Sequence, residues 1–494
     1  MIDLILLNGT ALTMDKNRRI IKNAGIAADG GKILFVGSAE EVKNKYEAKK
    51  IIDCGNHVIM PGFVDAHGHG GHSFFRFVVK DTMYWMPAMT HTYKNYIDDD
   101  FWYFEGRVSA LERLKAGVTT GVCVLGSQPR CDSPVFAENN AKAYLEIGVR
   151  DIVCTGPCHT PWPHNFSRWN GDKRAQRAVS FEEAVKSLEQ VIKTLNKTNG
   201  DKTFAYVTPF TIVTSINPSG ATPKDRLTKL TEHDKLQAKE MRRVADEYNT
   251  RIHSDCFGGM LELLKEDLSC ALIGPDVHLQ HCSHLNEDEV KILADSGTSA
   301  GVCPGSGAPV NVMLDAGVNT AITSDGTKLG YGFDMFGCMR QFQSVYRNMA
   351  NDYTLVPDAK AFEMVTVDAA KAIGLDGMIG SLEAGKQADI ITVDMFTPKL
   401  MPNFNLLFSL IQNASGADID NVIIDGEVLM ENRKLSFNEK EILLPAQKEA
   451  EKIIERAGLD KMARIDENNW GKVRKPRQPE LYDLEWQRND GGHY

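Results

Sequence analysis

Histidines and aspartates follow four separate apolar runs of this sequence, and these are the residue types that hold divalent metal ions. The first run ends in His67 and His69, and the alternation of an extended strand places both imidazoles on the same side. The other three sets are Arg251–Asp255, His278–His284 and Thr323–Gly326. One histidine in such a position is more often structural than a ligand. Because four strand ends agree, the pattern predicts a metal site.

We expect His67, His69, His253 and Asp325 to bind the ion. Imidazoles with one carboxylate suit zinc, with iron as the alternative. A zinc ion with an open position lowers the pKa of its bound water towards ~7 and so makes hydroxide available at neutral pH. Asp325 would then act as the general base. His281 would lie over the water and orient or polarise it.

The elements that must position these residues alternate between short apolar runs and helical stretches from about residue 61 to 380. This alternation indicates parallel βα units. The strand candidates are residues 63–67, 119–124, 151–155, 205–210, 251–254, 277–281, 299–303 and 320–324, and the helix candidates are 102–116, 181–195, 232–248 and 287–295. Eight such strands predict an α/β fold, a (β/α)₈ TIM barrel. In these barrels chemistry gathers at the C-terminal strand ends, where the histidines and aspartates lie.

Both ends of the chain contain further short strands. Residues 1–60 hold too few of them for a stable sandwich, and more appear at 389–394 and 422–429. We therefore expect one composite β-sandwich domain from residues 1–60 plus 381–438, with the barrel, 61–380, inserted between them. The remaining residues, 439–494, are predicted to form a helix and a charged tail. The tail, from about Arg464, carries Trp470, Tyr482 and Trp486. It could be disordered or pack as an arm on another subunit, and we favour the arm because isolated tryptophans are less usual on a disordered tail.

Composition limits the classes of partner. The net charge of -10 argues against nucleic acid or an anionic membrane surface. No apolar run approaches the ~20 residues of a membrane span, and Asp3 stands where a signal peptide would carry a basic residue. The ten cysteines include no CxxC pair, which indicates reduced thiols and a cytoplasmic location.

The stretch Pro61–His69, P-G-F-V-D-A-H-G-H, resembles the first-strand motif of the amidohydrolase superfamily. The downstream motifs resemble its chlorohydrolase and aminohydrolase branch, which includes S-adenosylhomocysteine deaminase, guanine deaminase and triazine hydrolases. They are H-C-x-H-L from His281, S-D-G at Asp325 and the closing run from Gly380, and the resemblance extends to about residue 435. It implies that His253 is the fifth-strand ligand, His281 the sixth-strand histidine and Asp325 the eighth-strand aspartate.

The resemblance also bears on the number of metal ions. Members with two metals bridge them with a modified lysine on the fourth strand. The fourth-strand candidate here, residues 204–210, contains no lysine. We therefore expect one divalent ion per chain.

One position departs from the deaminases of this branch. They usually carry a glutamate three residues after the fifth-strand histidine, and it passes a proton to the ring nitrogen. Here Cys256 occupies that position, and a thiol is a poor substitute. Asp255 is expected to point the other way if the strand continues. Either another acid serves, for example Asp255 after a bulge, or the reaction does not need this proton path.

Two enzyme hypotheses follow. The first is hydrolytic deamination of an aminated nitrogen heterocycle of the purine, pterin, pyrimidine or triazine type. The alternative is hydrolysis of a cyclic amide or amidine, or of another leaving group on a related ring. A non-enzymatic scaffold is not favoured, because a degenerate barrel should have lost ligands and this one keeps a full set.

Substrate contacts are expected from several loops. Trp85 and His72, after the first strand, could stack on a planar substrate or contact another subunit. Asp255, Cys256 and His284 are further candidates. The turn that begins at Cys303 could approach a ligand through its backbone. We expect a small heterocyclic substrate and a homodimer or larger homo-oligomer.

A second glycine-rich stretch is interpreted as structural. Gly380–Lys386 has the spacing of a phosphate-binding loop. Gln387, however, stands where such a loop requires serine or threonine for magnesium. We therefore interpret this stretch as a turn.

Overall fold

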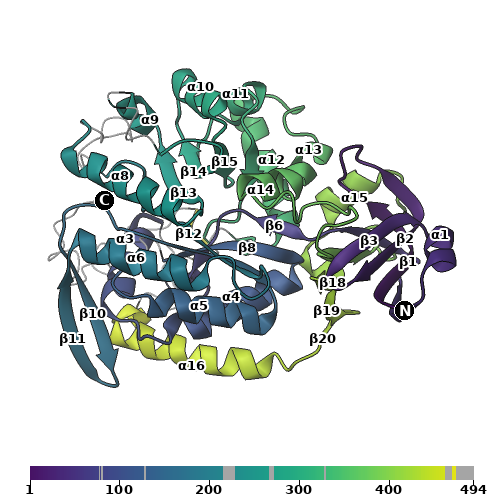
Figure 1. Ribbon diagram of the computed structural model, residues 1–494, viewed down its shortest axis with the longest axis horizontal. Helices are drawn as coiled ribbons and strands as arrows, with labels where there is room; N and C mark the ends of the chain where they lie inside the picture. Colours follow the sequence, from purple (N-terminus) through teal and green to yellow (C-terminus); the bar gives the residue numbers. More distant parts are fainter. Residues whose placement is uncertain are drawn as a thin grey trace.

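The computed structural model describes residues 1–76, 78, 82–126, 130–214, 229–265, 267, 272–326, 330–461 and 470–473. Within these residues an eight-stranded parallel barrel, covered by helices, lies beside a second sheet that contains both chain ends (Figure 1). The α/β barrel and the additional sheet domain confirm the predicted fold class.

All eight predicted barrel strands are present, in an unbroken order around the sheet. They are β6 (Phe63–Asp65), β8 (Val118–Leu125), β9 (Arg150–Thr155), β12 (Thr203–Val207), β13 (Ile252–Phe257), β14 (Val277–Ser283), β15 (Ser299–Val302) and β16 (Thr320–Ile322). The short β7 (His69–Gly70) continues the first strand against β8. A parallel bridge between Gly68 and Asp325 joins the first strand end to the eighth, and the Asp325 N–H donates to the His67 carbonyl at 2.9 Å.

The four predicted barrel helices are found within two residues of their expected limits. The described helices of the barrel are α2 (His72–Phe75), α3 (Thr82–Asn95), α4 (Phe101–Lys115), α5 (Val135–Ile147), α6 (Phe181–Leu195), α8 (Glu232–Glu247), α9 (Met260–Leu264), α10 (Glu287–Ser296), α11 (Val310–Asp315), α12 (Met335–Ala350), α13 (Asp358–Met364) and α14 (Val367–Ala372). The start of α6 was predictable because Ser180 and Glu183 form a capping box. Several elements were not predicted, among them α3, α5, α12 and the hairpin β10 (His164–Asn170) with β11 (Lys173–Val179).

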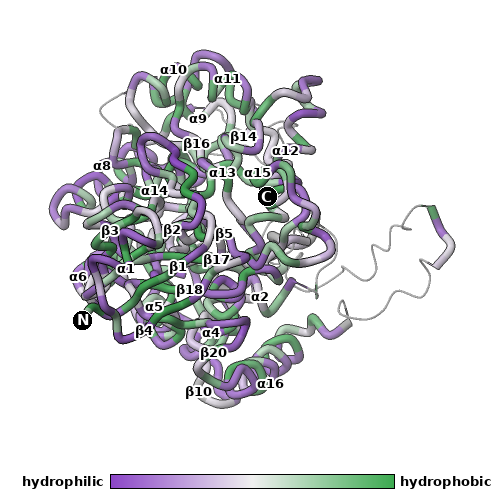
Figure 2. The backbone as a smooth tube through the Cα atoms, turned by 90° about the vertical axis from the view of Figure 1, so that its right-hand side faces the viewer, coloured by the Kyte–Doolittle hydropathy of each residue, from purple (hydrophilic) through white to green (hydrophobic). Residues whose placement is uncertain are grey.

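The second sheet joins the two ends of the chain. Its N-terminal strands are β1 (Ile2–Leu12), β2 (Ile20–Asp29), β3 (Lys32–Ser38), β4 (Ala48–Asp53) and β5 (His57–Pro61), with α1 (Ala39–Lys45) beside them. Its C-terminal strands are β17 (Ile390–Asp394), β18 (Ile419–Ile424), β19 (Glu427–Glu431) and β20 (Lys434–Leu435). β5 and β17 pair antiparallel and connect the two groups. Figure 2 faces this part of the molecule and shows β1 largely in the green of apolar residues.

A single core cluster contains Leu4, Ile26, Ile390 and Ile423, and thus draws on β1, β2, β17 and β18. For this reason we propose the division expected from the sequence, with residues 1–60 and 381–438 as one domain. One strand prediction was wrong. Residues 422–429 are not one strand but the hairpin β18–β19, which turns at Asp425 and Gly426 with φ of 49° and 75°. Asp-Gly with two positive φ angles is typical of a type I′ turn.

The C-terminal part continues with α15 (Leu406–Asn413) and α16 (Lys440–Arg456), the second of which confirms the helix predicted near residue 440. α16 packs along α4 (Figure 1). Tyr482 and Trp486 of the predicted tail lie outside the described residues, whereas Trp470 is described and exposed. None of the helices described is both long enough and apolar enough to cross a membrane. The nine cysteines in the described part are free thiols.

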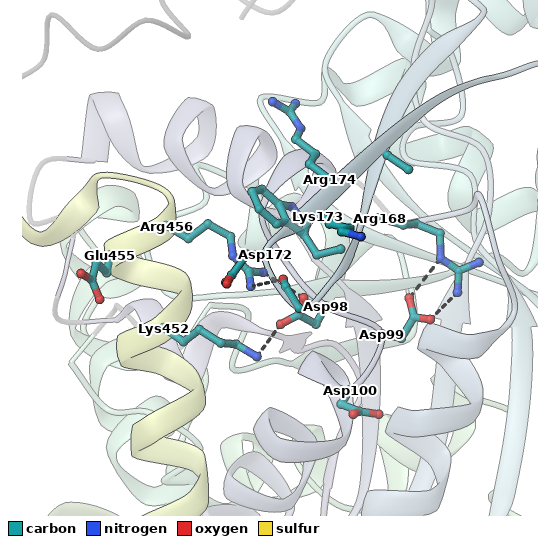
Figure 3. A pocket seen from close by; sticks show the side chains of 13 residues that line it. Asp98, Asp99, Asp100, Arg168, Asp172, Lys173, Arg174, Lys452, Glu455 and Arg456 are labelled. Carbon is teal, nitrogen blue, oxygen red and sulfur yellow. Dashed lines mark hydrogen bonds and ion pairs between the residues drawn. The ribbon is translucent and has the colours of Figure 1, made fainter.

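A hollow of about 1080 Å³ lies between the β10–β11 hairpin, the connection before α4 and the end of α16 (Figure 3). Five of its charged side chains pair with one another: Asp98 with Lys452 and Arg456, and Asp99 with Arg168. It contains none of the predicted site residues.

Candidate metal centre

A buried ion pair fixes the strand ends that carry the first and last predicted ligands. Asp65 of β6 lies 2.9 Å from Arg113 of α4, and both side chains are fully buried. Asp65 also accepts hydrogen bonds from Ser324, from the N–H at 3.0 Å and from the hydroxyl at 2.6 Å. A Cβ on Gly68 would lie only 2.4 Å from the Arg113 guanidinium, so glycine is required between the two histidines. The first and eighth strand ends are thereby held in register.

Three of the four predicted metal ligands, His67, His69 and Asp325, converge at this point, and His253 contacts Nδ1 of His67. Nε2 of His67 is 3.2 Å from Nε2 of His69, and Nδ1 of His67 is 2.8 Å from Nε2 of His253. Oδ1 of Asp325 lies 3.1 Å from Nε2 of His69 and 3.7 Å from Nε2 of His67. The three imidazoles are at most 6% exposed. Buried nitrogens that converge on a carboxylate are the donor set of a divalent ion such as zinc, so the residues present fit a metal.

Two further contacts orient these imidazoles. Nδ1 of His69 lies 2.9 Å from the Gly126 carbonyl, which leaves Nε2 free to act as a ligand. Nδ1 of His253 lies 3.0 Å from Nδ1 of His278, a residue that was not predicted. Burial lowers the pKa of His67, lowers that of His253 well below its usual range and lowers that of His278 to about 3. All three are therefore neutral, the form that binds metal.

His281 lies between two carboxylates and a thiol. Its Nε2 is 3.6 Å from Oδ2 of Asp255 and its Nδ1 is 3.7 Å from Sγ of Cys303. Burial opposes the charge on His281, but Asp255, Cys303 and Asp325 together raise its pKa well above the usual value. Burial likewise opposes ionisation of Asp325, yet its contacts with His67 and His69 keep its pKa well below the usual value. His281 is thus a cation that faces carboxylates.

Both His281 and Asp325 have left-handed backbones, with φ of 68° and 56°. This conformation is uncommon for residues other than glycine. It is concentrated at strained functional sites. Overlapping sets of ligand-type side chains lie here with donor atoms within 4.8 Å of one another: His67, His69 and Asp325; His67, Asp255 and His281; and His281, Cys303 and Asp325.

The expected orientation of Asp255 was wrong. Side chains alternate along β13, so His253 and Asp255 share the face that looks into the centre. Cys256 points the other way, is fully buried in the main core cluster and lies in hydrogen-bond contact with Cys282. The carboxylate at this strand end is therefore supplied by Asp255 and not by the position where the resemblance led us to expect an acid.

Of the predicted substrate contacts, His72 and Trp85 pack beside His69, whereas His284 lies on an exposed loop. The ring of His72 stacks on His69 at 4.4 Å, and Trp85 meets His72 edge-on at 5.2 Å. Trp85 is 1% exposed and belongs to the core, so the prediction that it stacks on a substrate is not supported. His284 is exposed on the loop after β14, where its N–H donates to the Gly307 carbonyl at 3.0 Å.

Known proteins resemble this chain along most of its length. The model of the amidohydrolase family matches residues 58–429. A 5-methylthioadenosine/S-adenosylhomocysteine deaminase of Syntrophobacter fumaroxidans is 27% identical over 89% of this chain and 96% of its own length. A 5′-deoxyadenosine deaminase of Methanosarcina mazei is also 27% identical, over 92% and 99%.

Solved structures share the fold. An adenosine deaminase from Xanthomonas campestris with bound zinc has a TM-score of 0.77 at 21% identity, and covers 92% of this chain and 99% of its own. An atrazine chlorohydrolase from Arthrobacter aurescens, complexed with zinc, has a TM-score of 0.76 at 17% identity and covers 90% and 100%. At these sequence identities the comparison shows a shared fold and no more.

Proposed function

Because this chain belongs to the amidohydrolase family and is a hydrolase acting on non-peptide C–N bonds, we propose that it deaminates an aminated purine nucleoside. Two observations support this substrate class. The relatives at 27% identity are named for deamination of adenosine derivatives. In addition, the metal centre has an acid, Asp255, that faces His281 across 3.6 Å.

We assign one divalent ion, zinc, to His67, His69, His253 and Asp325. The zinc present in two similar structures supports this choice. When bound, such an ion supplies a water whose pKa is lowered towards ~7 and which can therefore act as a nucleophile at neutral pH. The neutral imidazoles of His67 and His253 are ready to act as ligands without loss of a proton.

The other steps are assigned to side chains of this protein. Asp325 would accept a proton at the centre and return it to the departing amine. His281, held as a cation by Asp255, would stabilise negative charge that develops on the attacked carbon's oxygen. Burial opposes ionisation of Asp255, but His281 lowers its pKa, so Asp255 is a carboxylate before the reaction. It would take up one proton of the attacking water and pass it to the ring nitrogen beside the amine-bearing carbon, the task that a glutamate performs in the deaminases this chain resembles.

The alternative, hydrolysis of a cyclic amide or of another leaving group, depended on the absence of an acid at Cys256. Asp255 removes that reason, because it faces the centre from the same strand. We therefore do not favour the alternative.

We further propose a cytoplasmic homo-oligomer with reduced thiols. The free cysteines of the described residues support the thiol state. The net charge of -10 argues against nucleic acid and anionic membranes as partners.

The test is ammonia release by zinc-loaded protein from adenosine, 5′-deoxyadenosine, 5-methylthioadenosine and S-adenosylhomocysteine, with guanine, a pterin and a triazine for comparison. We expect release from at least one adenosine derivative and none from the same substrate with the His67→Ala variant. If none of the adenosine derivatives releases ammonia although one zinc is bound per chain, the proposed function is refuted.

A further inference from the structure

The turn after β15 reaches into the metal centre with a side chain. It reads Cys303-Pro304-Gly305-Ser306-Gly307, and only its backbone was expected to approach a ligand. Cys303 is 3% exposed, and its thiol lies 3.4 Å from Oδ2 of Asp325. The same sulfur is 3.7 Å from Nδ1 of His281. Cys303 therefore contacts both residues assigned to proton transfer and charge stabilisation.

The two carboxylate oxygens of Asp325 have different neighbours. Oδ1 faces the imidazoles of His69 and His67, at 3.1 Å and 3.7 Å. Oδ2 faces the Cys303 thiol. A carboxylate is free to rotate about its last bond unless a partner holds the second oxygen, because this torsion is broad. The thiol is a donor at that oxygen, and the rotation is thereby restricted.

The geometry pairs the Cys303 thiol, as donor, with Oδ2 of Asp325, as acceptor. A protonated thiol can donate a hydrogen bond, although it is a poor nucleophile. The contact is thus that of a donor with its acceptor.

The same turn is itself anchored. The Tyr346 hydroxyl of α12 donates to the Cys303 carbonyl at 3.0 Å, and the Ser306 hydroxyl donates to the His281 carbonyl at 3.2 Å. The two hydroxyl oxygens are 3.0 Å apart. His281 has the left-handed φ of 68°, so the Ser306 contact holds its carbonyl in an uncommon backbone conformation.

We propose that Cys303 is a positioning residue, whose thiol holds Oδ2 of Asp325 so that Oδ1 is presented to the metal ion. The effect on turnover rests on the proposed function, whereas the effect on metal affinity does not. Hydrogen-bond partners of metal ligands commonly account for tenfold to hundredfold in metal affinity or activity. Cys303 acts through Asp325 and need not touch the substrate.

The experiment compares Cys303→Ala, which removes the donor, with Cys303→Ser, which keeps an O–H donor. Cys338→Ala is the matched control, because Cys338 is also a buried thiol near the eighth strand and donates to the Thr323 carbonyl at 3.3 Å. Zinc affinity is measured by competition with a chromogenic chelator, and kcat and KM are measured by ammonia release. Circular dichroism and thermal unfolding verify that each variant is folded.

We expect Cys303→Ala to bind zinc about tenfold to hundredfold more weakly and to lose kcat with little change in KM at saturating zinc. Cys303→Ser should recover most of both quantities, and Cys338→Ala should bind zinc as the unmodified protein does. Wild-type zinc affinity in folded Cys303→Ala would overturn the proposal, and so would equal losses in the serine and alanine variants. If no adenosine derivative is deaminated but the zinc affinities follow this order, the proposed function fails and the role of Cys303 stands.

Discussion

Replacement of Asp255 by asparagine tests which residue supplies the acid at the fifth strand end. The substitution keeps the shape of the side chain and removes its charge and its ability to take up and pass on a proton. The carboxylate lies 3.6 Å from His281 in a site where both side chains are mostly buried, 13% and 16% exposed, so no solvent proton donor replaces it easily. Loss of a general acid typically costs 10²- to 10⁴-fold in rate. At about 1.4 kcal/mol per tenfold, the barrier rises by roughly 3–5 kcal/mol.

The neighbouring residue provides the control. Cys256 is fully buried and faces the core, away from His281. Cys256→Ala removes one heavy atom from a packed site, which should cost about 1 kcal/mol of unfolding free energy, as deletion of a buried methyl does. We expect its kcat to stay within about threefold of wild type, since proton transfer contributes far more than that.

The assay is steady-state ammonia release with the best adenosine derivative at saturating zinc, together with urea unfolding of each variant. Zinc content is measured in parallel, so that a lost metal ion is not taken for a lost acid. A kcat of Asp255→Asn within about tenfold of wild type would refute the assignment, because it falls below the range for a general acid. A larger loss in Cys256→Ala than in Asp255→Asn would also refute it.

Three further predictions concern stability. Asp65→Ala leaves the buried Arg113 charge without its partner and should lower the unfolding free energy in urea by about 3–5 kcal/mol, so a change below 1 kcal/mol would contradict the role of this pair. Burial raises the pKa of Asp151 from 3.8 to about 8, so the folded state keeps a proton that the unfolded state releases. Stability should therefore fall as pH rises from ~4 to ~8, by up to roughly 1.4 kcal/mol per unit, and Asp151→Asn should remove this slope in thermal unfolding. Chelation should lower the Tm, since zinc at a hundred times its Kd adds about 2.7 kcal/mol, and His67→Ala should gain nothing from added zinc.

Most of the barrel was predictable because its strands are short apolar runs bounded by turn residues. The positions of His67, His69 and Asp325 followed from these runs, since His67 and Asp325 come just after β6 and β16 and His69 begins the short β7. His253 was expected near a strand end, but β13 continues beyond it to Phe257. Closure of the barrel then brings distant strand ends together, as the bridge between Gly68 and Asp325 illustrates. Periodicity and strand order were sufficient for this part of the site.

The resemblance placed the fifth-strand acid at position 256, where this chain has Cys256. In the structure the carboxylate that faces His281 from this strand belongs to Asp255. Alternation along the strand places Asp255 on the face of His253, and this could have been inferred from the sequence alone. His278 and Cys303 were harder to find. Each is a small buried polar group within an apolar strand or at its end, and only the distances to His253 and Asp325 distinguish them from ordinary core residues.

Two local errors have different causes. The hairpin β18–β19 contains Asp425-Gly426, a turn signal that was overlooked within an apolar stretch. The segment around Trp85 was interpreted as part of a loop that could cover a planar substrate or contact another subunit, but residues 82–95 are helical. They form α3, whose Trp85 and Tyr93 fill the core beside His72. Aromatic residues near a predicted site are thus weak indicators of a binding surface.

The shared sheet has a consequence for synthesis of the chain on the ribosome. β5 is made before the whole barrel, but its partner β17 is made after it. Until then β5 has a sheet edge with unpaired N–H and C=O groups, and such edges promote association between chains. Pairing of β5 with β17 closes a chain segment that contains the whole barrel. The entropy cost of closing such a long segment is only slightly larger than for a short one, since this cost grows with the logarithm of the length. A product that terminates before β17 would therefore contain every metal ligand and still be prone to aggregate.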